Sequence, residues 1–223
     1  MGAISAIIEI FPVLVQGLRI TVLILLASAV FGYFMAFVAG FGRLSRFFII
    51  RKISGLYIEI FRGTSLIVQL FWLYYALPIL FDIHLGNDFW VGALAIGLNY
   101  GAYMSEVVRT SINSVADGQR EASVALNMSS FQQMRYIIFP QALRMMLPEF
   151  GNYLIQMLKA TSLVSLIALK DVLYYGEIMR SSNISMAPTI YLLILLFYFI
   201  LALPLIFLTR KMEKMSKKGV ASQ

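Results

Sequence analysis

Long apolar segments alternate with short polar ones along most of this chain. Five segments approach or exceed the ~20 residues that an α-helix needs to cross a bilayer. They cover residues 11–41, 56–81, 89–110, 145–169 and 189–209. The pattern predicts an all-α membrane protein with about five transmembrane helices, forming one membrane domain over residues 1–223.

Basic residues gather at alternate ends of these segments. On one side lie the first connection, the third connection and the tail, with Arg43, Arg46, Arg51, Lys52, Arg120, Arg135, Arg144, Arg210, Lys211 and Lys214. The connections on the other side carry Asp82, Asp88, Asp171 and Glu177. Because positively charged loops stay in the cytoplasm, the N-terminus is predicted outside and the C-terminus inside, which requires an odd number of crossings.

Composition supports a membrane protein and argues against several other classes. Hydrophobic residues make up 60% of the chain and charged residues only 13%, against about 25% in soluble domains. The net charge of +7 comes from bases that flank apolar segments, so membrane topology explains it and no nucleic-acid partner is expected. No phosphate-binding loop, catalytic triad or metal-binding motif occurs, so no catalytic residue, metal or cofactor is expected in this chain.

Polar side chains inside the apolar segments recur at helical spacing. Ionisable residues at membrane depth tend to face the bundle interior or a wet cavity. One stripe holds Asn99, Tyr103 and Glu106, and a second holds Glu149, Asn152, Gln156 and Lys159. Such stripes suit a path for a small zwitterion. The alternative is that the charges pair with each other, as Glu59 with Arg62 and Glu106 with Arg109, and only hold the bundle together.

Residues 121–140 form a moderately polar, helix-forming stretch on the predicted cytoplasmic side. Glu121 falls in a first helical turn, where its charge suits the helix dipole. Small residues on one face would let another surface approach closely, and this face contains Ala122, Ala125 and Met128. The helix is expected to end near Asn127, since asparagine tolerates the left-handed conformation. A second helical piece follows and is expected to break at Pro140.

This stretch resembles the EAA loop of ABC importer permeases. Glu121 and Ala122 match the pattern, and Pro140 lies at the expected distance. Ser123, Asn127 and Phe139 stand where the pattern has Ala, Gly and Leu. The resemblance implies that residues 117–140 form a cytoplasmic coupling loop that docks an ATPase subunit. The docking residues implied are Glu121, Ala122, Ser123, Ala125, Asn127 and Met128.

Further pieces, in order along the chain, resemble polar amino acid permeases. Phe61-Arg62-Gly63-Thr64 is followed by Gln69 and by Leu77-Pro78, with Ser65 where proline is usual. Tyr103, Glu106 and Arg109 match a Y-x-x-E-x-x-R piece, and residues 159–163 match K-x-T-S-L. With the polar stripes, these pieces give the candidate translocation path: Asn99, Tyr103, Glu106, Asn152, Gln156, Lys159, Thr161 and Ser162.

The resemblance implies an ABC type I importer permease in a bacterial cytoplasmic membrane. Its partners would be an ABC ATPase subunit that carries ATP and Mg²⁺, a second permease subunit, identical or a sister chain, and an extracytoplasmic solute-binding protein. The solute would be a polar amino acid or a similar small zwitterion. A compatible solute of the ectoine type is the alternative.

Two other classes of function compete with this interpretation. An ion-coupled secondary transporter would show inverted repeats or paired unwound helices, and the sequence shows neither. A membrane enzyme or scaffold would need a catalytic constellation at one interface, and none is visible.

Overall fold

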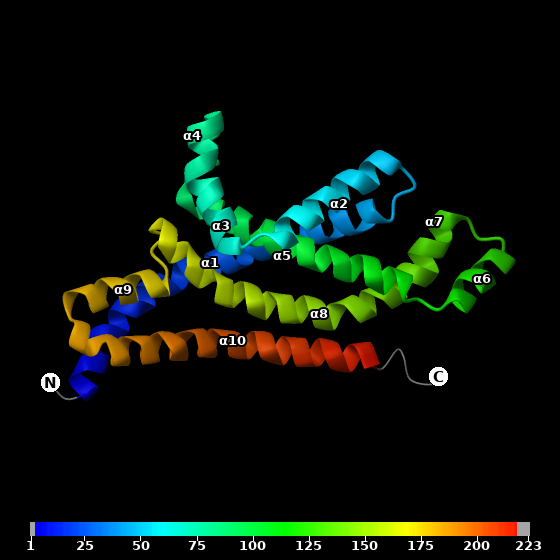
Figure 1. Cartoon of the computed structure of the whole chain (residues 1–223). Coiled ribbons are helices and arrows are strands. Elements are labelled where there is room, and N and C mark those ends of the chain that lie inside the picture. The colour runs from blue at the N-terminus through cyan, green and yellow to red at the C-terminus, as the bar shows by residue number, and fades with distance from the viewer. Residues whose placement is uncertain (1–2, 218–223) are drawn as a thin grey trace.

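The computed structural model describes residues 3–217, with side chains for residues 8–216, and this part of the chain is helical without a β-strand. Four long helices run roughly along one axis: α1 (Ala3–Arg43), α5 (Asp88–Asn113), α8 (Phe139–Ala160) and α10 (Ala187–Lys217). α5 lies at the centre and packs against α1, α8 and α2 (Phe48–Gly63). The chain therefore forms a bundle around α5 (Figure 1).

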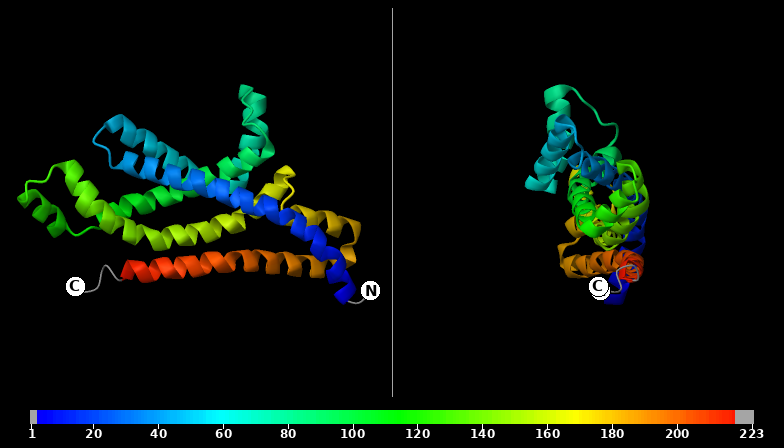
Figure 2. Two further views of the ribbon diagram at one scale, coloured as in Figure 1. Left: turned by 180° about the vertical axis from the view of Figure 1, so that it is seen from behind. Right: turned by 90° about the vertical axis from the view of Figure 1, so that its right-hand side faces the viewer.

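The second predicted segment is not one straight span. α2 ends at Gly63, and α3 (Leu66–Phe71) starts an arm that continues through a π-helical turn (Trp72–Ala76) into α4 (Leu77–Phe81). The arm makes an angle of 108° with α2 and projects sideways from the bundle (Figures 1 and 2). α2 also begins at Phe48, earlier than expected, because Arg51 and Lys52 lie exposed and their charges can reach the interface.

The predicted break at Pro140 does not occur. α6 (Asp117–Ala125) and α7 (Ser130–Gln132) are followed by a π-helical turn over Gln133–Ile138 that leads directly into α8. The Phe139 N–H bonds the Met134 carbonyl, five residues back. This wider turn removes the clash that the ring of Pro140 would make with the carbonyl four residues earlier in a regular α-helix. The chain therefore stays helical from Ser130 to Ile167.

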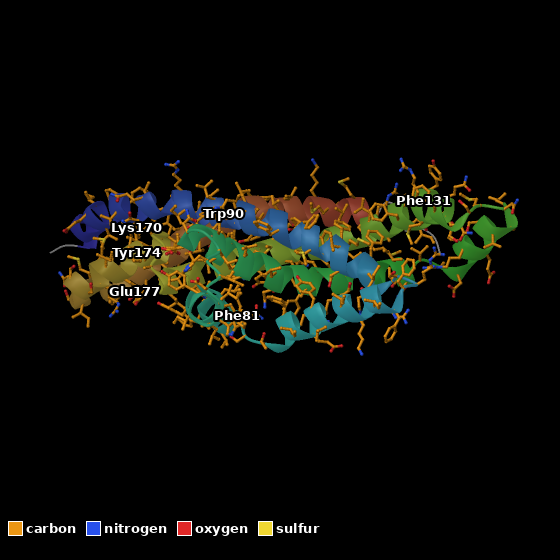
Figure 3. The ribbon with its side chains drawn as sticks, turned by 90° about the horizontal axis from the view of Figure 1, so that it is seen from above. Phe81, Trp90, Phe131, Lys170, Tyr174 and Glu177 are labelled. Atoms are coloured by element: carbon orange, nitrogen blue, oxygen red, sulfur yellow. The ribbon has the colours of Figure 1, made fainter. Side chains whose placement is uncertain are left out.

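The two ends of the bundle differ in chemistry. One end holds the connection after α1, the loop with α6 and α7, and the end of α10, so the basic clusters meet there (Figure 1). At the opposite end lie the start of α1 and α9 (Val172–Ser182), which follows the 3-10 helix Thr161–Ile167. Figure 3 shows Lys170, Tyr174 and Glu177 near this end and Phe131 near the other.

Two hydrophobic cores stabilise the described residues. The larger surrounds α5 and includes Ile96, Met104, Val108, Met146, Met157 and Leu158. The smaller joins α1, α9 and α10 at the end opposite α6 and includes Ile10, Leu14, Val172, Ile190 and Phe197. Asp171 caps the start of α9, where its carboxylate accepts the Tyr174 N–H at 2.8 Å. α10 follows a short 3-10 helix, Ile184–Met186.

By length and composition, two helical stretches within residues 3–217 could each cross a membrane. They are Ile8–Arg43 and Ile184–Ser216, and the number rises to four if each of two bent pairs is one span. The pairs are α2 with the arm, and Ser130–Ile167 with α9. α5 is not among these candidates, so five spans stay a prediction.

Candidate functional site

The break between α2 and α3 is held by two buried carboxamides. Gln69 is 9% exposed and Asn99 is 5% exposed. The Gln69 Nε2 donates to the carbonyls of Phe61 and Thr64 at 2.9 and 3.3 Å and to Thr64 Oγ1 at 2.7 Å. Asn99 Nδ2 donates to Phe61 O at 2.9 Å and Gln69 Oε1 at 3.1 Å. The two amides thus satisfy carbonyls that the helix end leaves without partners.

A polar pocket opens beside this break. Its volume is about 380 Å³, within the usual range for small-molecule sites. Residues from the break, α5 and α8 line it: Thr64, Ser65, Leu66, Asn99, Tyr100, Tyr103, Tyr153 and Gln156. A neighbouring pocket on the other side of the break, between Ile60 and Leu73, has mostly apolar walls. The polar pocket is therefore the better candidate for a polar solute.

Three tyrosines form one wall of the polar pocket. Tyr100, Tyr103 and Tyr153 have ring centroids between 6.2 and 6.5 Å apart, and we call them the tyrosine cluster. The Tyr100 hydroxyl donates to Gln156 O at 3.4 Å, and the Tyr103 hydroxyl donates to Arg62 O at 3.3 Å. Backbone carbonyls thus hold two of the three hydroxyls, and α5 and α8 hold the rings side by side.

The structure gathers some of the predicted path residues and separates others. Asn99, Tyr103 and Gln156 line the polar pocket together. Asn152 and Lys159 lie exposed on α8. The Thr161 side chain is buried and donates to Leu158 O at 2.7 Å, while Ser162 Oγ donates to Lys159 O at 2.8 Å. Sequence reasoning missed Thr64, Ser65, Tyr100 and Tyr153.

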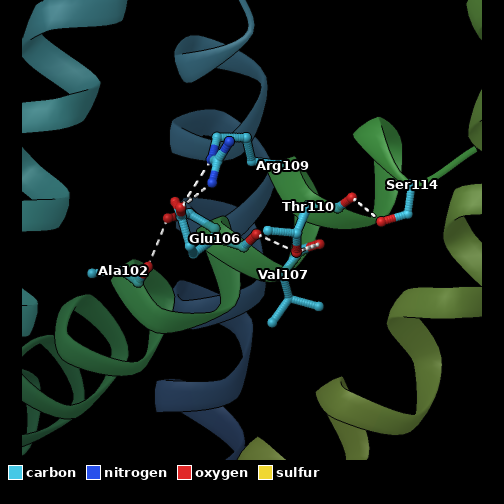
Figure 4. A network of polar contacts seen from close by, with 7 residues as sticks. Ala102, Glu106, Val107, Arg109, Thr110 and Ser114 are labelled. Atoms are coloured by element: carbon cyan, nitrogen blue, oxygen red, sulfur yellow. Dashed lines mark hydrogen bonds and ion pairs between the residues drawn. The ribbon is translucent and has the colours of Figure 1, made fainter.

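Of the two predicted ion pairs, one forms. Arg109 Nε donates to Glu106 Oε1 at 2.9 Å (Figure 4), so Glu106 is paired on its own helix. Among the described side chains Glu59 and Arg62 do not pair, and that expectation was wrong. The Arg62 guanidinium lies over the Tyr103 ring instead, 5.3 Å from its centroid, because α2 packs against α5.

α8 carries a stripe of exposed polar side chains next to the pocket. Its members are Glu149, Asn152, Gln156 and Lys159. Polar and charged groups on a membrane helix normally face protein or water, because hydrocarbon cannot solvate them. This face of α8 is therefore unsuited to lipid.

The loop that contains α6 is anchored to the bundle, and α6 ends near Asn127 as predicted. Arg120 Nη2 donates to Ile112 O at 2.7 Å and ties α6 to α5. Asn127 has a φ of 55°, which confirms the left-handed helix end. The Met128 N–H then bonds Ser123 O at 3.1 Å. Ser129 starts α7 with a capping box to Gln132.

The exposed surface of this loop differs in part from the expected one. Glu121, Ala122, Ala125 and Asn127 are exposed, and Met128 is partly exposed. Ser123 is 2% exposed and donates to Arg120 O, so its hydroxyl faces inward and is not on the outer surface of α6. Sequence reasoning missed large exposed apolar side chains: Val124, Leu126 and Phe131, at 63%, 74% and 69%. Their spacing follows neither a helix nor a strand period, so the sequence pattern did not predict an apolar surface here.

Comparisons with known proteins agree with this arrangement. Residues 28–217 match the family described as "Binding-protein-dependent transport system inner membrane component". The probable amino-acid ABC transporter permease protein y4tF of Sinorhizobium fredii is 45% identical, over 89% of this chain and 84% of the length of y4tF. The glutamine transport system permease protein GlnP of Escherichia coli is 34% identical over 96% of this chain and 97% of its own.

A solved structure shares the fold. The structure titled "Crystal structure of an amino acid ABC transporter with histidines" is 31% identical, with a TM-score of 0.87 over 96% of this chain and 98% of its own. The fold and site thus define a helical membrane permease of the ABC type I kind. The chain belongs to the family of binding-protein-dependent transport system inner-membrane components, and it is a permease subunit of an ABC importer.

Proposed function

We propose that this chain forms half of a membrane pathway that carries an amino acid into a bacterial cell across the cytoplasmic membrane. The exposed polar stripe on α8 beside the polar pocket carries this proposal. In a membrane this stripe must face protein or water, and a second permease subunit, identical or a sister chain, would cover it and enclose the path. Asn99, Tyr103 and Gln156 would line the path. Asn152 and Lys159 would line it where the partner subunit closes it.

The chain would form one domain and cross the membrane five times, with α5 as the third span. α5 is long enough, since 26 residues rise about 39 Å. Polar residues of the candidate path lower its hydropathy, and neighbouring helices shield it from lipid. Because the basic clusters meet at the end that holds α6, this end would lie in the cytoplasm and the N-terminus outside.

The α6 loop would dock an ABC ATPase subunit. The exposed face of this loop would combine small side chains with one carboxylate, and its residues are Glu121, Ala122, Ala125, Asn127 and Met128. The exposed apolar side chains Val124, Leu126 and Phe131 add a hydrophobic surface that an ATPase groove would bury. ATP and Mg²⁺ would bind to that subunit, so this chain would hold no cofactor and catalyse no reaction.

The solute would be a polar amino acid delivered by an extracytoplasmic binding protein. GlnP is named for glutamine and y4tF for amino acids. Neither name supports the ectoine alternative. Thr161 and Ser162 bond to the backbone of their own helical turn and would shape the path from behind its surface.

The docking surface provides the test. Glu121→Arg should release the ATPase from membranes or abolish uptake, because it reverses the charge on the exposed face of α6. Glu213→Arg makes the same change at an exposed site at the same end of the bundle and should leave both intact. Co-purification of the ATPase with the tagged chain, and uptake of labelled amino acids by cells, would report the two results. Normal uptake and full co-purification by Glu121→Arg would refute the docking surface.

The path has its own test. Lys159→Met keeps the length of the side chain but removes its charge, and it should weaken uptake while the ATPase still co-purifies. Unchanged uptake would exclude Lys159 from the path.

A further inference from the structure

The connection between α1 and α2 gathers cations and aromatic rings at the basic end of the bundle. The Arg46 guanidinium lies 5.3 Å from the centroid of the Phe47 ring. The Phe48 ring is flanked twice, by the Arg51 guanidinium at 5.9 Å and by the Lys52 ammonium at 5.6 Å. Three of the five cation–π contacts among the described side chains therefore fall between Arg46 and Lys52, a segment that we call the basic turn.

The charges of the basic turn have no carboxylate partner nearby. Its three cations form no ion pair among the described side chains. α2 packs mainly against α1 and α5, and of the acids on those two helices only Glu106 lies at this end, where it bonds to Arg109. The first acid on α2 is Glu59, seven residues beyond Lys52. It lies about 10 Å away along the helix, which is about one Debye length in 0.1 M salt.

An exposed apolar stripe begins beside the basic turn and runs along α2. Its members are spaced i, i+4, i+7 and i+11, so they share one face of the helix. Each side chain is at least half exposed, and the members are Ile49, Ile53, Leu56 and Ile60. The stripe is about 16 Å long, close to half of the ~30 Å hydrocarbon thickness of a bilayer. Cations at one end of an apolar stripe one leaflet long fit an amphiphile with an anionic head group.

We propose that the basic turn and the apolar stripe of α2 bind an anionic phospholipid. This inference goes beyond the proposed function and does not depend on which solute is carried. The lipid phosphate would lie among Arg46, Arg51 and Lys52, and one acyl chain would lie along the stripe. Phe47 and Phe48 would lie between head group and chain. Clusters of basic residues beside a membrane helix attract anionic lipids in this way.

The position of the basic turn favours lipid over the ATPase as its partner. The α6 loop projects farther along the bundle axis than this turn (Figures 1 and 2). An ATPase docked on that loop would therefore leave the basic turn on its membrane side. Arg51 Nη1 donates to Ser45 O at 3.3 Å, so this guanidinium is already held at the turn. Arg43 is not part of the site, because its guanidinium lies against Gly55 between α1 and α2.

Fluorescence quenching by spin-labelled lipids tests the site. The chain contains no cysteine, so Ile49→Cys gives one attachment point for a fluorophore beside the basic turn. The labelled full chain is assembled with its ATPase and placed in phosphatidylcholine vesicles that contain increasing fractions of nitroxide-labelled phosphatidylglycerol or nitroxide-labelled phosphatidylcholine. In 0.1 M salt phosphatidylglycerol should bind about fivefold more tightly, the gain that one basic residue gives near an anionic surface. In 1 M salt the preference should fall to about twofold or less, because the Debye length shortens to about 3 Å.

Substitutions with the fluorophore at the same position give the controls. Arg51→Gln/Lys52→Gln removes both cations beside Phe48 and should reduce the preference to about twofold or less. Arg51→Lys/Lys52→Arg keeps both charges and should retain the preference. Arg210→Gln/Lys211→Gln is the matched control, because it removes two adjacent exposed cations from α10 at the same end of the bundle, and it should change nothing at the fluorophore. If a thermal unfolding curve shows that the first variant does not fold, Arg46→Gln provides a second removal and should about halve the preference.

Three results would overturn the inference. The first is equal quenching by the two lipids with the basic turn intact, or a preference that survives both Arg51→Gln/Lys52→Gln and 1 M salt. The second is quenching by neither lipid, which would show that protein covers this face of α2. The third is loss of the ATPase from Arg51→Gln/Lys52→Gln together with equal quenching, which would assign the basic turn to the ATPase. The proposed function is tested separately, by uptake and by Glu121→Arg.

Discussion

The amide network at the helix break should be the most sensitive structural element near the pocket. Gln69→Leu keeps most of the side-chain volume but deletes the two N–H groups that three oxygens share and one bond accepted from Asn99, about three hydrogen bonds in all. Hydrogen bonds between membrane helices are worth about 0.6 kcal/mol each on average, so the variant should lose about 2 kcal/mol of unfolding free energy. The loss should also distort the pocket, because Thr64 and Asn99 both line it.

Reversible unfolding of the purified chain in mixed detergent micelles would measure this loss. Gln16→Leu is the matched control, since Gln16 lies exposed on α1 and makes no side-chain hydrogen bond among the described residues, so its loss should cost nothing. The double variant Gln69→Leu/Asn99→Leu should be less destabilised than the sum of the single variants, because both delete one shared bond. Wild-type stability in Gln69→Leu, or strict additivity in the double variant, would refute the reasoning.

Three further predictions concern backbone geometry. Gly17→Ala should prevent close packing of α1 on α9 and lower the melting temperature strongly, because a Cβ there would clash with the Asp171 backbone. Gly118→Ala should leave the melting temperature unchanged, because a Cβ there would meet open space. Asn127→Gly should leave stability unchanged, and Asn127→Val should cost about 1–2 kcal/mol, because φ is positive there. Ser129→Ala should cost about 1 kcal/mol through the lost capping box, measured by thermal unfolding.

Much of the fold could be predicted from the sequence, because hydropathy marks long helices strongly. The predicted segments 11–41, 89–110 and 189–209 lie wholly within helices, and Asn127 ends α6 as its chemistry suggests. The hydropathy of residues 56–81 predicts one span, and the short polar run Arg62-Gly63-Thr64-Ser65 within it marks the position of the break but not its angle of 108°. Of the two buried amides that hold the break, Gln69 lies on α3 but Asn99 comes from α5, and local sequence carries no signal for that long-range contact.

Only some residues of the candidate site could be predicted from the sequence. Helical spacing identified Asn99, Tyr103 and Gln156, because polar groups in apolar segments stand out. Tyr100 and Tyr153 did not stand out, since tyrosine is also common at membrane interfaces and so gives a weak signal for a path. Arg62 was assigned to Glu59 because ion pairs within one helix follow from spacing alone. Its actual contact with Tyr103 depends on how α2 packs against α5, which spacing within one helix does not specify.

The bend between α2 and the arm also constrains the order in which the chain can be completed during its synthesis. Asn99, which donates to the Phe61 carbonyl at the bend, lies 38 positions downstream. While the ribosome is still making α5, the Phe61 carbonyl can accept only from Gln69, and the two bonds that Asn99 donates at the bend are missing. We therefore expect the bend to be fixed late, after α5 is complete, and insertion intermediates truncated before Asn99 to vary more widely in the angle between α2 and the arm.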